Sequence, residues 1–403
     1  MFSPPDDIPV LDIDPFSEEI LSDPLDYQTL LREAGPLVWL SKYGFYAVGG
    51  YDEAAGVLAD WRQFSSTRGV GPTDLAKEKP WWGEQAVLIE SDPPRHNEIK
   101  AQVMKIYNPK AVTELGKEFE KKAQQLLDRL LVSDHFDGHL DIAEPYILRV
   151  FGDALGIQEG HRKELVTIGE FGFNNFGPRN EVLEKGKQEM DRLGAMDWMI
   201  ARTQKSAVRA GSLGKQLHDL SETGELTEAE SANVMRGQLA AGVDTTIAAL
   251  GFLLYCFAIY PDQYQLVRKD PDLATKAFEE AVRLFSPLQT IMRTVVHDGE
   301  IGGLPVRADH KIVVSMAAAN RDPRKFDHPD HFDLTRKLTG HLGFGRGVHT
   351  CVGMHVAMLE AEKLIQSIAR RISGFSLAGE VAMKVNNTMR GPSRLPLQVT
   401  LAD

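Results

Sequence analysis

The spacing of apolar residues along the chain is mostly helical. Apolar side chains that recur three and four positions apart, with polar residues between them, are typical of amphipathic helices. This pattern predicts helices over residues 26–34, 52–58, 92–108, 115–131, 143–155, 162–175, 180–208, 262–268 and 272–284, and another that follows Cys351. The chain is therefore expected to be mainly α.

Strand-like segments are fewer and lie towards both ends of the chain. Short apolar runs between turn residues predict strands at residues 37–40, 45–48, 294–297, 311–316 and 397–400. Between residues 64 and 90 no periodic pattern continues, and a loop of that length is usually functional. We expect a minor β portion that combines segments from both ends.

The longest predicted helix begins at Thr227, which can form a capping box with Glu230, and ends before Pro261. At 1.5 Å per residue it would be about 45 Å long and cross a whole domain. Asp244 and Thr245 lie in its apolar middle, where polar side chains are costly unless they are hydrogen-bonded. The pattern leaves open whether they form a satisfied kink or a functional pair.

Composition narrows the class of protein. No linker-like run divides the 403 residues, so a single large domain over residues 1–403 is expected. A net charge of -12 disfavours binding to nucleic acid or to an anionic membrane. The stretch 247–260 is too short to span a bilayer, and the first residues lack a signal-peptide pattern. With only two cysteines and no disulfide framework, we expect a cytoplasmic protein.

One of those cysteines, Cys351, follows a loop that contains Gly345 and Gly347 and precedes a helical pattern. Amide N–H groups at a helix N-terminus lower the pKa of a thiol, so we expect a thiolate here. A single thiolate without further Cys or His partners cannot form a zinc cage, but it can be the axial ligand of haem iron. A structural cysteine beside a glycine-rich turn is the alternative.

The whole segment reads Phe344-Gly-Arg-Gly-Val-His-Thr-Cys-Val-Gly353, and it resembles the haem-binding loop of the cytochrome P-450 superfamily. The resemblance extends over nearly the whole chain. It implies the cytochrome P-450 fold and a haem b (iron protoporphyrin IX) with Cys351 as the iron ligand. Phe344, Gly345 and Gly353 would shape the haem-binding loop. It also implies a monooxygenase that uses dioxygen and two electrons.

The resemblance assigns roles around the haem. Asp244 and Thr245 match the acid–alcohol pair of the family: Thr245 would hydrogen-bond to dioxygen, and Asp244 would relay protons from solvent. The residues that match contacts to the haem propionates are His96, Lys100, Arg293 and His349. Lys100 stands where the family usually has arginine.

A second implied feature is structural. Glu280 and Arg283 match the Glu-x-x-Arg pair that stabilises the fold behind the haem. His331 stands at the position of its usual third partner, an arginine, so we expect a variant triad.

Further segments resemble the bacterial subfamily that O-demethylates para-methoxybenzoates, at residues 65–71, 77–81, 173–178 and 386–391. By this resemblance Phe173 and Phe176 would hold a planar aromatic ring, although ordinary core aromatics are an alternative. The other residues expected to line an apolar substrate pocket are Val87, Ile89, Ala240, Ala241, Leu288, Ile291 and Met389.

The chain departs from this subfamily where a benzoate carboxylate would bind. The loop reads Trp-Gly-Glu-Gln-Ala at 82–86, without the expected Arg and Ser, and Gly237 replaces a serine beside Arg236. Lost hydrogen bonds, and repulsion from Glu84 if it points inward, would disfavour a carboxylate. We expect a small, neutral or weakly polar aromatic substrate such as a methoxyphenol, which is hydroxylated or O-demethylated. A para-substituted benzoate is the alternative.

No flavin or iron–sulfur segment is evident, so electrons from NAD(P)H would arrive through a ferredoxin and a ferredoxin reductase. The candidate docking residues on the cysteine-loop side are Arg62, Lys105, Lys110, Arg336 and Arg346. Two other classes stay open. A peroxide-driven peroxygenase typically lacks the acid–alcohol pair, and a haem-based sensor or ligand carrier more often has histidine ligation and an output domain.

Overall fold

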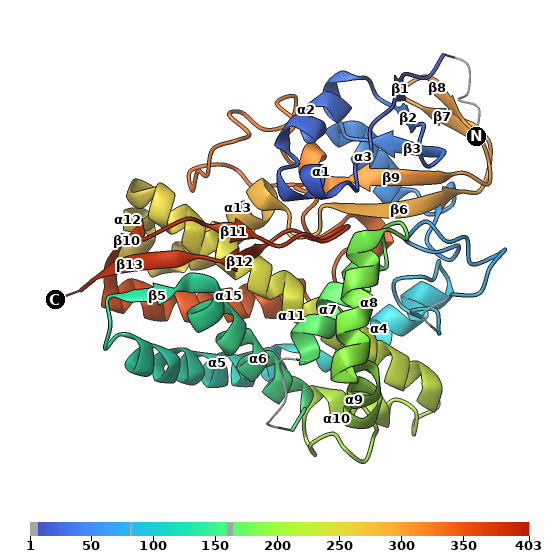
Figure 1. Cartoon of the computed structure of the whole chain (residues 1–403). Helices are drawn as coiled ribbons and strands as arrows, with labels where there is room; N and C mark the ends of the chain where they lie inside the picture. Colours follow the sequence, from blue (N-terminus) through green and yellow to red (C-terminus); the bar gives the residue numbers. More distant parts are fainter. Residues whose placement is uncertain (1–6, 81–82, 159–163, 403) are drawn as a thin grey trace.

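The computed structural model describes residues 7–80, 83–158 and 164–402. Figure 1 shows a large helical part beside a smaller part built around a sheet. The helices are α1 (Glu18–Ser22), α2 (Leu25–Glu33), α3 (Tyr51–Ala59), α4 (Arg95–Ile106), α5 (Pro109–Leu130), α6 (Glu144–Leu155), α7 (Glu164–Asn174), α8 (Glu181–Leu193), α9 (Ala195–Arg202), α10 (Leu213–Asp219), α11 (Glu228–Ile259), α12 (Pro261–Lys269), α13 (Ala274–Phe285), α14 (Met316–Ala319) and α15 (Met354–Arg371). The expectation of a mainly α fold with a minor β portion is confirmed.

The main sheet has six strands in the order β1-β2-β3-β9-β6-β4. Its members are β1 (Val10–Leu11), β2 (Val38–Leu40), β3 (Phe45–Val48), β4 (Phe64–Ser65), β6 (Thr290–Val295) and β9 (Lys311–Ser315). Parallel pairing of β3 with β9 joins the N-terminal strands to those after residue 290. Since β6 pairs antiparallel to β9, Arg293 lies opposite Ile312.

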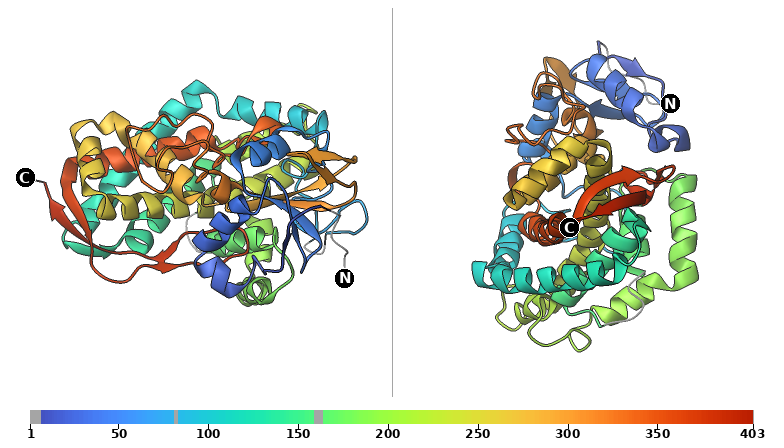
Figure 2. Two further views of the ribbon diagram at one scale, coloured as in Figure 1. Left: turned by 90° about the horizontal axis from the view of Figure 1, so that it is seen from above. Right: turned by 90° about the vertical axis from the view of Figure 1, so that its left-hand side faces the viewer.

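The C-terminal strands form separate small sheets. β10 (Ile372–Leu377) pairs with β13 (Pro396–Leu401), which also pairs with β5 (His135–Asp137) from the middle of the chain. Two further hairpins are β7 (Gly299–Ile301) with β8 (Leu304–Val306), and β11 (Ala382–Met383) with β12 (Pro392–Arg394). Figure 2 shows the C-terminal strands against the helical part, apart from the main sheet.

Most predicted elements form within a few residues of their expected bounds, but the helix expected over residues 180–208 is wrong. It is divided into α8 and α9 by Gly194, whose φ of 58° is left-handed and ends α8. A glycine adopts that conformation without a steric penalty, so the chain can change direction there. The sequence pattern also missed several short elements, namely α1, α10, α14, β1, β4, β5, β7, β8, β10, β11 and β12, although β13 was predicted.

Helix α11 is the central element of the helical part. Its capping box is confirmed: the Thr227 hydroxyl accepts from the Glu230 amide at 3.1 Å, and the Glu230 carboxylate accepts from the Thr227 amide at 2.9 Å. An 18-residue window of α11 is apolar enough to cross a membrane, a longer stretch than residues 247–260 suggested, yet 72% of that window is buried. This burial is typical of a core helix.

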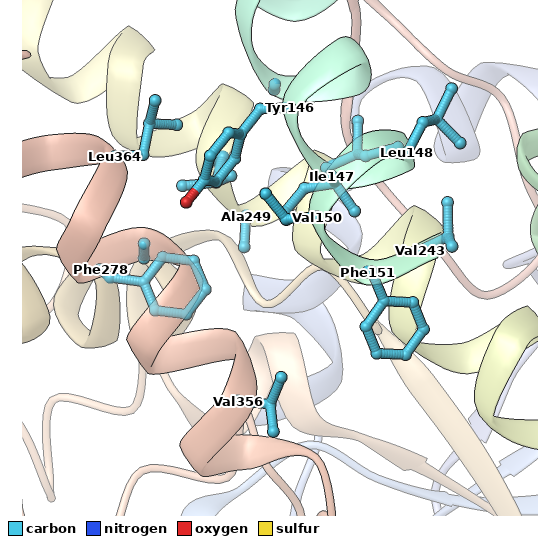
Figure 3. Close-up of a cluster of buried hydrophobic side chains, with 14 of the residues drawn as sticks. Tyr146, Ile147, Leu148, Val150, Phe151, Val243, Ala249, Phe278, Val356 and Leu364 are labelled. Carbon is cyan, nitrogen blue, oxygen red and sulfur yellow. The ribbon is translucent and has the colours of Figure 1, made fainter. Parts of the chain in front are cut away.

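The core around α11 also contains α6, α13 and α15. Figure 3 shows one cluster to which these helices contribute Tyr146, Ile147, Leu148, Val150, Phe151, Val243, Ala249, Phe278, Val356 and Leu364. Because α15 begins just after Cys351, packing of α15 on α11 and α13 fixes the position of the cysteine loop.

A buried ion cluster lies behind this core, and its third member differs from the prediction. Glu280 and Arg283 are fully buried and joined at 2.7 and 2.8 Å. Arg336 Nε donates to Glu280 at 3.0 Å, whereas His331 contributes only its backbone carbonyl, which accepts from Arg283 at 3.1 Å. The expectation that His331 completes the triad is therefore wrong. The turn at residues 327–336 brings Arg336 to Glu280 instead, and sequence spacing does not reveal that turn.

Candidate functional site

The cysteine loop is shaped by two left-handed glycines. Gly345 and Gly347 have φ angles of 72° and 70°, and a Cβ atom on Gly347 would lie 3.0 Å from the Cα atom of Ala59 in α3. The Cys351 amide donates to the carbonyl of Phe344 at 2.9 Å and closes the loop. Any residue with a side chain at 347 would be strained and would collide with α3.

Two opposing effects act on the pKa of the Cys351 thiol. Its side chain is accessible, yet it is surrounded closely enough for burial to raise the pKa of the thiol. Hydrogen bonds from the amides of Gly353 and Met354 and the charge of Lys100 lower that pKa, as expected for a helix N-terminus, but less than burial raises it. The expected thiolate is therefore not favoured in the protein alone, since desolvation outweighs the amide dipoles. A coordinating metal cation removes the proton.

One face of α11 is accessible as well. Gly237, Ala241 and Thr245 follow one another at intervals of four residues and therefore share a face of α11. Gly237 and Ala241 are exposed and Thr245 is half-buried, whereas most of the surrounding helix is buried. Helix α11 packs on α15, which begins three residues after Cys351, so this open stripe and the cysteine loop belong to neighbouring parts of the fold. A flat cofactor can lie between them.

Three of the predicted propionate contacts, His96, Arg293 and His349, lie together as buried nitrogen donors. The rings of His96 and His349 are 4.2 Å apart, and Arg293 is 2% exposed. Burial lowers the pKa of Arg293 to about 10 and that of His349 to about 4. The Nε2 atom of His349 has no hydrogen-bond partner among the described residues, and Asp92 lies 4.0 Å away. A buried guanidinium and a buried imidazole nitrogen without a hydrogen-bond partner are suited to bind the carboxylates of a haem.

The fourth predicted contact, Lys100, makes its hydrogen bonds elsewhere. From α4 its ammonium donates to the carbonyls of Val348 and Thr350 at 2.6 and 2.7 Å. Lys100 thus braces the cysteine loop directly.

Asp244 and Thr245 have different environments. The hydroxyl of Thr245 donates to the carbonyl of Ala241 at 2.6 Å. Asp244 is 1% exposed, and burial raises the pKa of its carboxyl to about 6 although Lys384 opposes that rise. Lys384 Nζ lies 3.0 Å from Asp244 Oδ1 and 2.5 Å from the carboxylate of Glu170 in α7. The Oδ2 atom of Asp244 has no hydrogen-bond partner among the described residues.

Sequence reasoning did not identify Lys384 and Glu170. Glu170 has a side chain that is 38% exposed, so the cluster connects the protein surface to Asp244 through the largely buried Lys384. Lys384 is 140 positions from Asp244 and belongs to no motif, which is why only the folded structure brings them together.

The predicted aromatic pair lies in an apolar cluster. Phe173 and Phe176 pack edge to face with ring centroids 5.9 Å apart. The cluster also contains three other residues: Leu288, Met389 and Ala248, the last of which was not predicted. Ile89 and Ile291 pack on the side of this cluster that faces the main sheet. Ala240 lies beside Gly172 of α7, and Val87 packs against the helical core.

The loop before Val87 is attached to α11. The Oδ1 atom of Asn233 accepts from the Val87 amide at 3.0 Å, and its Nδ2 atom donates to the carbonyl of Gln85 at 3.0 Å. One turn further, Arg236 Nε donates to the carboxylate of Glu84 at 2.9 Å. The polar residues of this loop are therefore held by α11.

The candidate docking residues do not form one basic patch. Arg62 and Arg346 are exposed, and Arg346 also donates to the hydroxyl of Tyr51 at 3.2 Å. Lys105 is paired with Glu225 at 2.8 Å. The expectation for Arg336 is wrong, since its side chain is 8% exposed and belongs to the Glu280 cluster. The side chain of Lys110 lies outside the described residues.

Comparison with known proteins agrees with this geometry. A family model described as cytochrome P450 matches residues 176–377. Cytochrome P450 CYP199A2 of Rhodopseudomonas palustris is 40% identical over 396 residues, which cover 98% of this chain and 95% of that protein. Cytochrome P450 CYP109Q5 of Chondromyces apiculatus has a similar structure, with a TM-score of 0.78, 29% identity, and 97% and 99% of the two chains covered.

The structure of P450BioI in complex with an acylated acyl carrier protein matches with a TM-score of 0.83 and 26% identity, over 95% of this chain and 100% of that one. Members of this family bind haem b and receive electrons from redox partners. The chain belongs to the cytochrome P450 family and is a haem-dependent monooxygenase.

Proposed function

We propose that this monooxygenase hydroxylates or O-demethylates a small, flat, neutral aromatic compound, with a methoxyphenol as the favoured type. Two observations support the proposal: the apolar cluster around Phe173 and Phe176, and the pairing of Arg236 with Glu84. Apolar walls and aromatic edges favour a planar ring. The charge of Arg236 is neutralised by Glu84, which disfavours its use for an acid.

In this proposal Cys351 holds the haem iron, with Phe344, Gly345 and Gly353 shaping the loop around it. His96, Arg293 and His349 bind the propionates, while Lys100 holds the cysteine loop. When bound, haem supplies the activation of dioxygen and the insertion of one oxygen atom into a substrate C–H bond. The open stripe on α11, with Ala241 and Thr245, would leave room for the small reactants.

Protons would reach this stripe through Asp244 and Thr245. A carboxyl group with a pKa near 6 can both accept and release a proton close to neutral pH. Glu170 at the surface and Lys384 between the two carboxylates supply a path from solvent. By turning its hydroxyl away from the carbonyl of Ala241, Thr245 would donate a hydrogen bond into the open stripe and receive a proton from Asp244 in return.

We further propose that the protein works in the cytoplasm and receives electrons from NAD(P)H through a ferredoxin and its reductase. Arg62, Lys105 and Arg346 are docking candidates with exposed side chains, and Lys110 stays a candidate outside the described side chains. Gly347 of the cysteine loop packs on α3, which ends just before Arg62. An acidic partner surface would fit this position.

The test is a panel of aromatic ligands added to the haem-loaded protein, scored by the shift of the Soret band and followed by product identification with NADH, ferredoxin and reductase. We expect methoxyphenols of the guaiacol type to bind more tightly than para-methoxybenzoate and to yield a phenol and formaldehyde. Tight binding of para-methoxybenzoate, with no shift for the phenols, would overturn the proposed substrate class.

Binding of carbon monoxide without product from any ligand would favour a carrier or sensor. Turnover with peroxide but not with NADH would favour a peroxygenase.

A further inference from the structure

The ion pair between Glu84 and Arg236 is more than a contact between flexible surface residues. The side chain of Arg236 is 16% exposed, and both its Nε and Nη2 atoms donate to the same carboxylate oxygen. Among the residues that the structure describes, Glu84 is the only acidic partner of Arg236. A largely buried guanidinium depends strongly on its counter-ion, because it has lost most of its hydration.

The loop that carries Glu84 is fixed at this position. Asn233 forms two hydrogen bonds with the loop backbone, to Gln85 and Val87. The side chain of Gln85 donates to the carbonyl of Glu90 at 2.6 Å, which closes the loop on itself. Glu84 is thus presented to Arg236 by an ordered backbone, and the same loop continues into the pocket residues Val87 and Ile89.

Arg236 lies next to the open stripe of α11, on an adjacent face of the helix. It directly precedes Gly237 and is five residues, or about 7.5 Å of helix rise, from Ala241. Helix α7 runs antiparallel along this part of α11, since Gly169 lies beside Asp244 and Gly172 lies beside Ala240. The end of α7 that carries Phe173 therefore points along α11 towards Arg236. The loop that carries Glu84 continues to Ile89, which packs against the same hydrophobic cluster as Phe176, so this loop joins the ion pair to the aromatic pair.

The guanidinium fork is the protein group best suited to bind a carboxylate. In this chain the carboxylate comes from the protein itself. An aromatic acid could bind Arg236 only by displacing Glu84. If Glu84 stayed in place, its negative charge would repel the carboxylate of the acid. A neutral phenol or ether meets neither obstacle.

We propose that Glu84 is an internal substitute for a substrate carboxylate, which neutralises Arg236 and makes the pocket select neutral aromatic compounds over aromatic acids. This inference rests on the proposed function, since it assigns the charge selectivity of the same pocket. It makes Glu84 and Arg236 a specificity-determining pair, and it identifies a single charge whose removal should change the substrate class.

The test is the variant Glu84→Gln, which keeps the size of the side chain and removes its charge. Dissociation constants for para-methoxybenzoate and para-methoxyphenol are measured on the haem-loaded protein by Soret titration and by calorimetry, so that the readout does not depend on turnover. We expect the ratio of the benzoate constant to the phenol constant to fall by about tenfold or more. In the double variant Glu84→Gln/Arg236→Gln the ratio should return towards that of the parent protein.

The matched control is Glu78→Gln, which removes one exposed carboxylate from the same loop region and makes the same change in net charge. A ratio that stays constant in Glu84→Gln, or that falls equally in Glu78→Gln, would overturn the inference. A fall that persists without Arg236 would also overturn it. If the parent protein bound neither ligand class but Glu84→Gln gained benzoate binding, the proposed substrate would be wrong while the pairing would stand.

Discussion

Two ion clusters, each with a buried carboxylate, differ in how completely their atoms are paired. In the cluster of Glu280, Arg283 and Arg336, the guanidinium of Arg283 also donates to the backbone carbonyls of Asn320 and Pro329, both at 2.8 Å. In the cluster of Asp244, Lys384 and Glu170, one oxygen of the buried Asp244 has no partner among the described residues and the third member reaches the surface.

The difference separates a structural role from a chemical one. A fully paired cluster has no group that gains by accepting or losing a proton, so it can only stabilise the fold. A cluster with an unpaired carboxylate oxygen, a pKa near 6 and contact with solvent can transfer protons. The clusters also differ in exposure, since the side chain of Arg336 is 8% exposed and that of Glu170 is 38% exposed. The unpaired oxygen of Asp244 and this contact with solvent are what distinguish the second cluster.

The largest effect should follow from breaking the fully paired cluster. The variant Glu280→Gln leaves Arg283 buried without its counter-ion, at a cost of about 3–5 kcal/mol in the free energy of unfolding. We expect little folded, haem-containing protein, as measured by chemical denaturation and haem content. Glu189→Gln is the matched control, because Glu189 forms the same i,i+3 pair with Arg192 in solvent, and it should leave the denaturation midpoint unchanged. Equal effects of the two variants would contradict the structural role.

The identity of the third member can be tested within the same cluster. Arg336→Leu removes a side chain that donates to Glu280 and to the carbonyls of Asp327 and His328, so we expect a loss of about 2–4 kcal/mol in the free energy of unfolding. His331→Ala keeps the backbone carbonyl that Arg283 uses and should be close to neutral. Both variants are compared by chemical denaturation under identical conditions. If His331 were the true partner of Glu280, His331→Ala would lose more unfolding free energy than Arg336→Leu.

Changes in the cluster of Asp244, Lys384 and Glu170 should affect turnover and not folding. Asp244→Asn preserves the size of the side chain but cannot relay a proton as a carboxylate does, so we expect product formation to fall by about 10²-fold. Haem content and the spectrum of the reduced carbon monoxide complex should remain those of the parent protein. A variant that kept full turnover would exclude Asp244 from the proton path.

The smallest predicted effect is a shift in pH dependence. The charge of Lys384 lowers the pKa of Asp244, while burial, Glu170 and Glu144 raise it. In Lys384→Met the pKa should therefore rise above about 6, so that Asp244 stays protonated to higher pH. If turnover needs the ionised form, the acidic limb of the kcat profile moves to higher pH, and Lys384→Arg should restore it. An unchanged profile in Lys384→Met would separate Lys384 from the proton path.

Local features of this protein were predictable because they depend on neighbours in the sequence. The glycine-punctuated loop before Cys351, the capping box at Thr227 and the helical spacing of α11 each involve residues a few positions apart. The cradle of His96, Arg293 and His349 was found only through resemblance to a family, since its members lie far apart in the chain.

Long-range side-chain partners could not be predicted in this way. Lys384 reaches Asp244 across 140 positions, and Glu84 reaches Arg236 across 152 positions. Arg336 replaced His331 because a turn in irregular backbone determined which side chain reached Glu280. The pKa of Cys351 was misjudged for a related reason: helix position is visible in the sequence, but desolvation depends on the whole fold.

The central claim is that Cys351 holds a haem iron opposite the open face of α11. The most direct measurement is the absorption spectrum of the haem-loaded protein, reduced under carbon monoxide, for the parent chain and for Cys351→His. The parent should give the red-shifted Soret maximum of thiolate ligation, and the variant should lose it while still binding haem. A parent spectrum of the histidine-ligated type, or a thiolate maximum that survives in Cys351→His, would contradict the account.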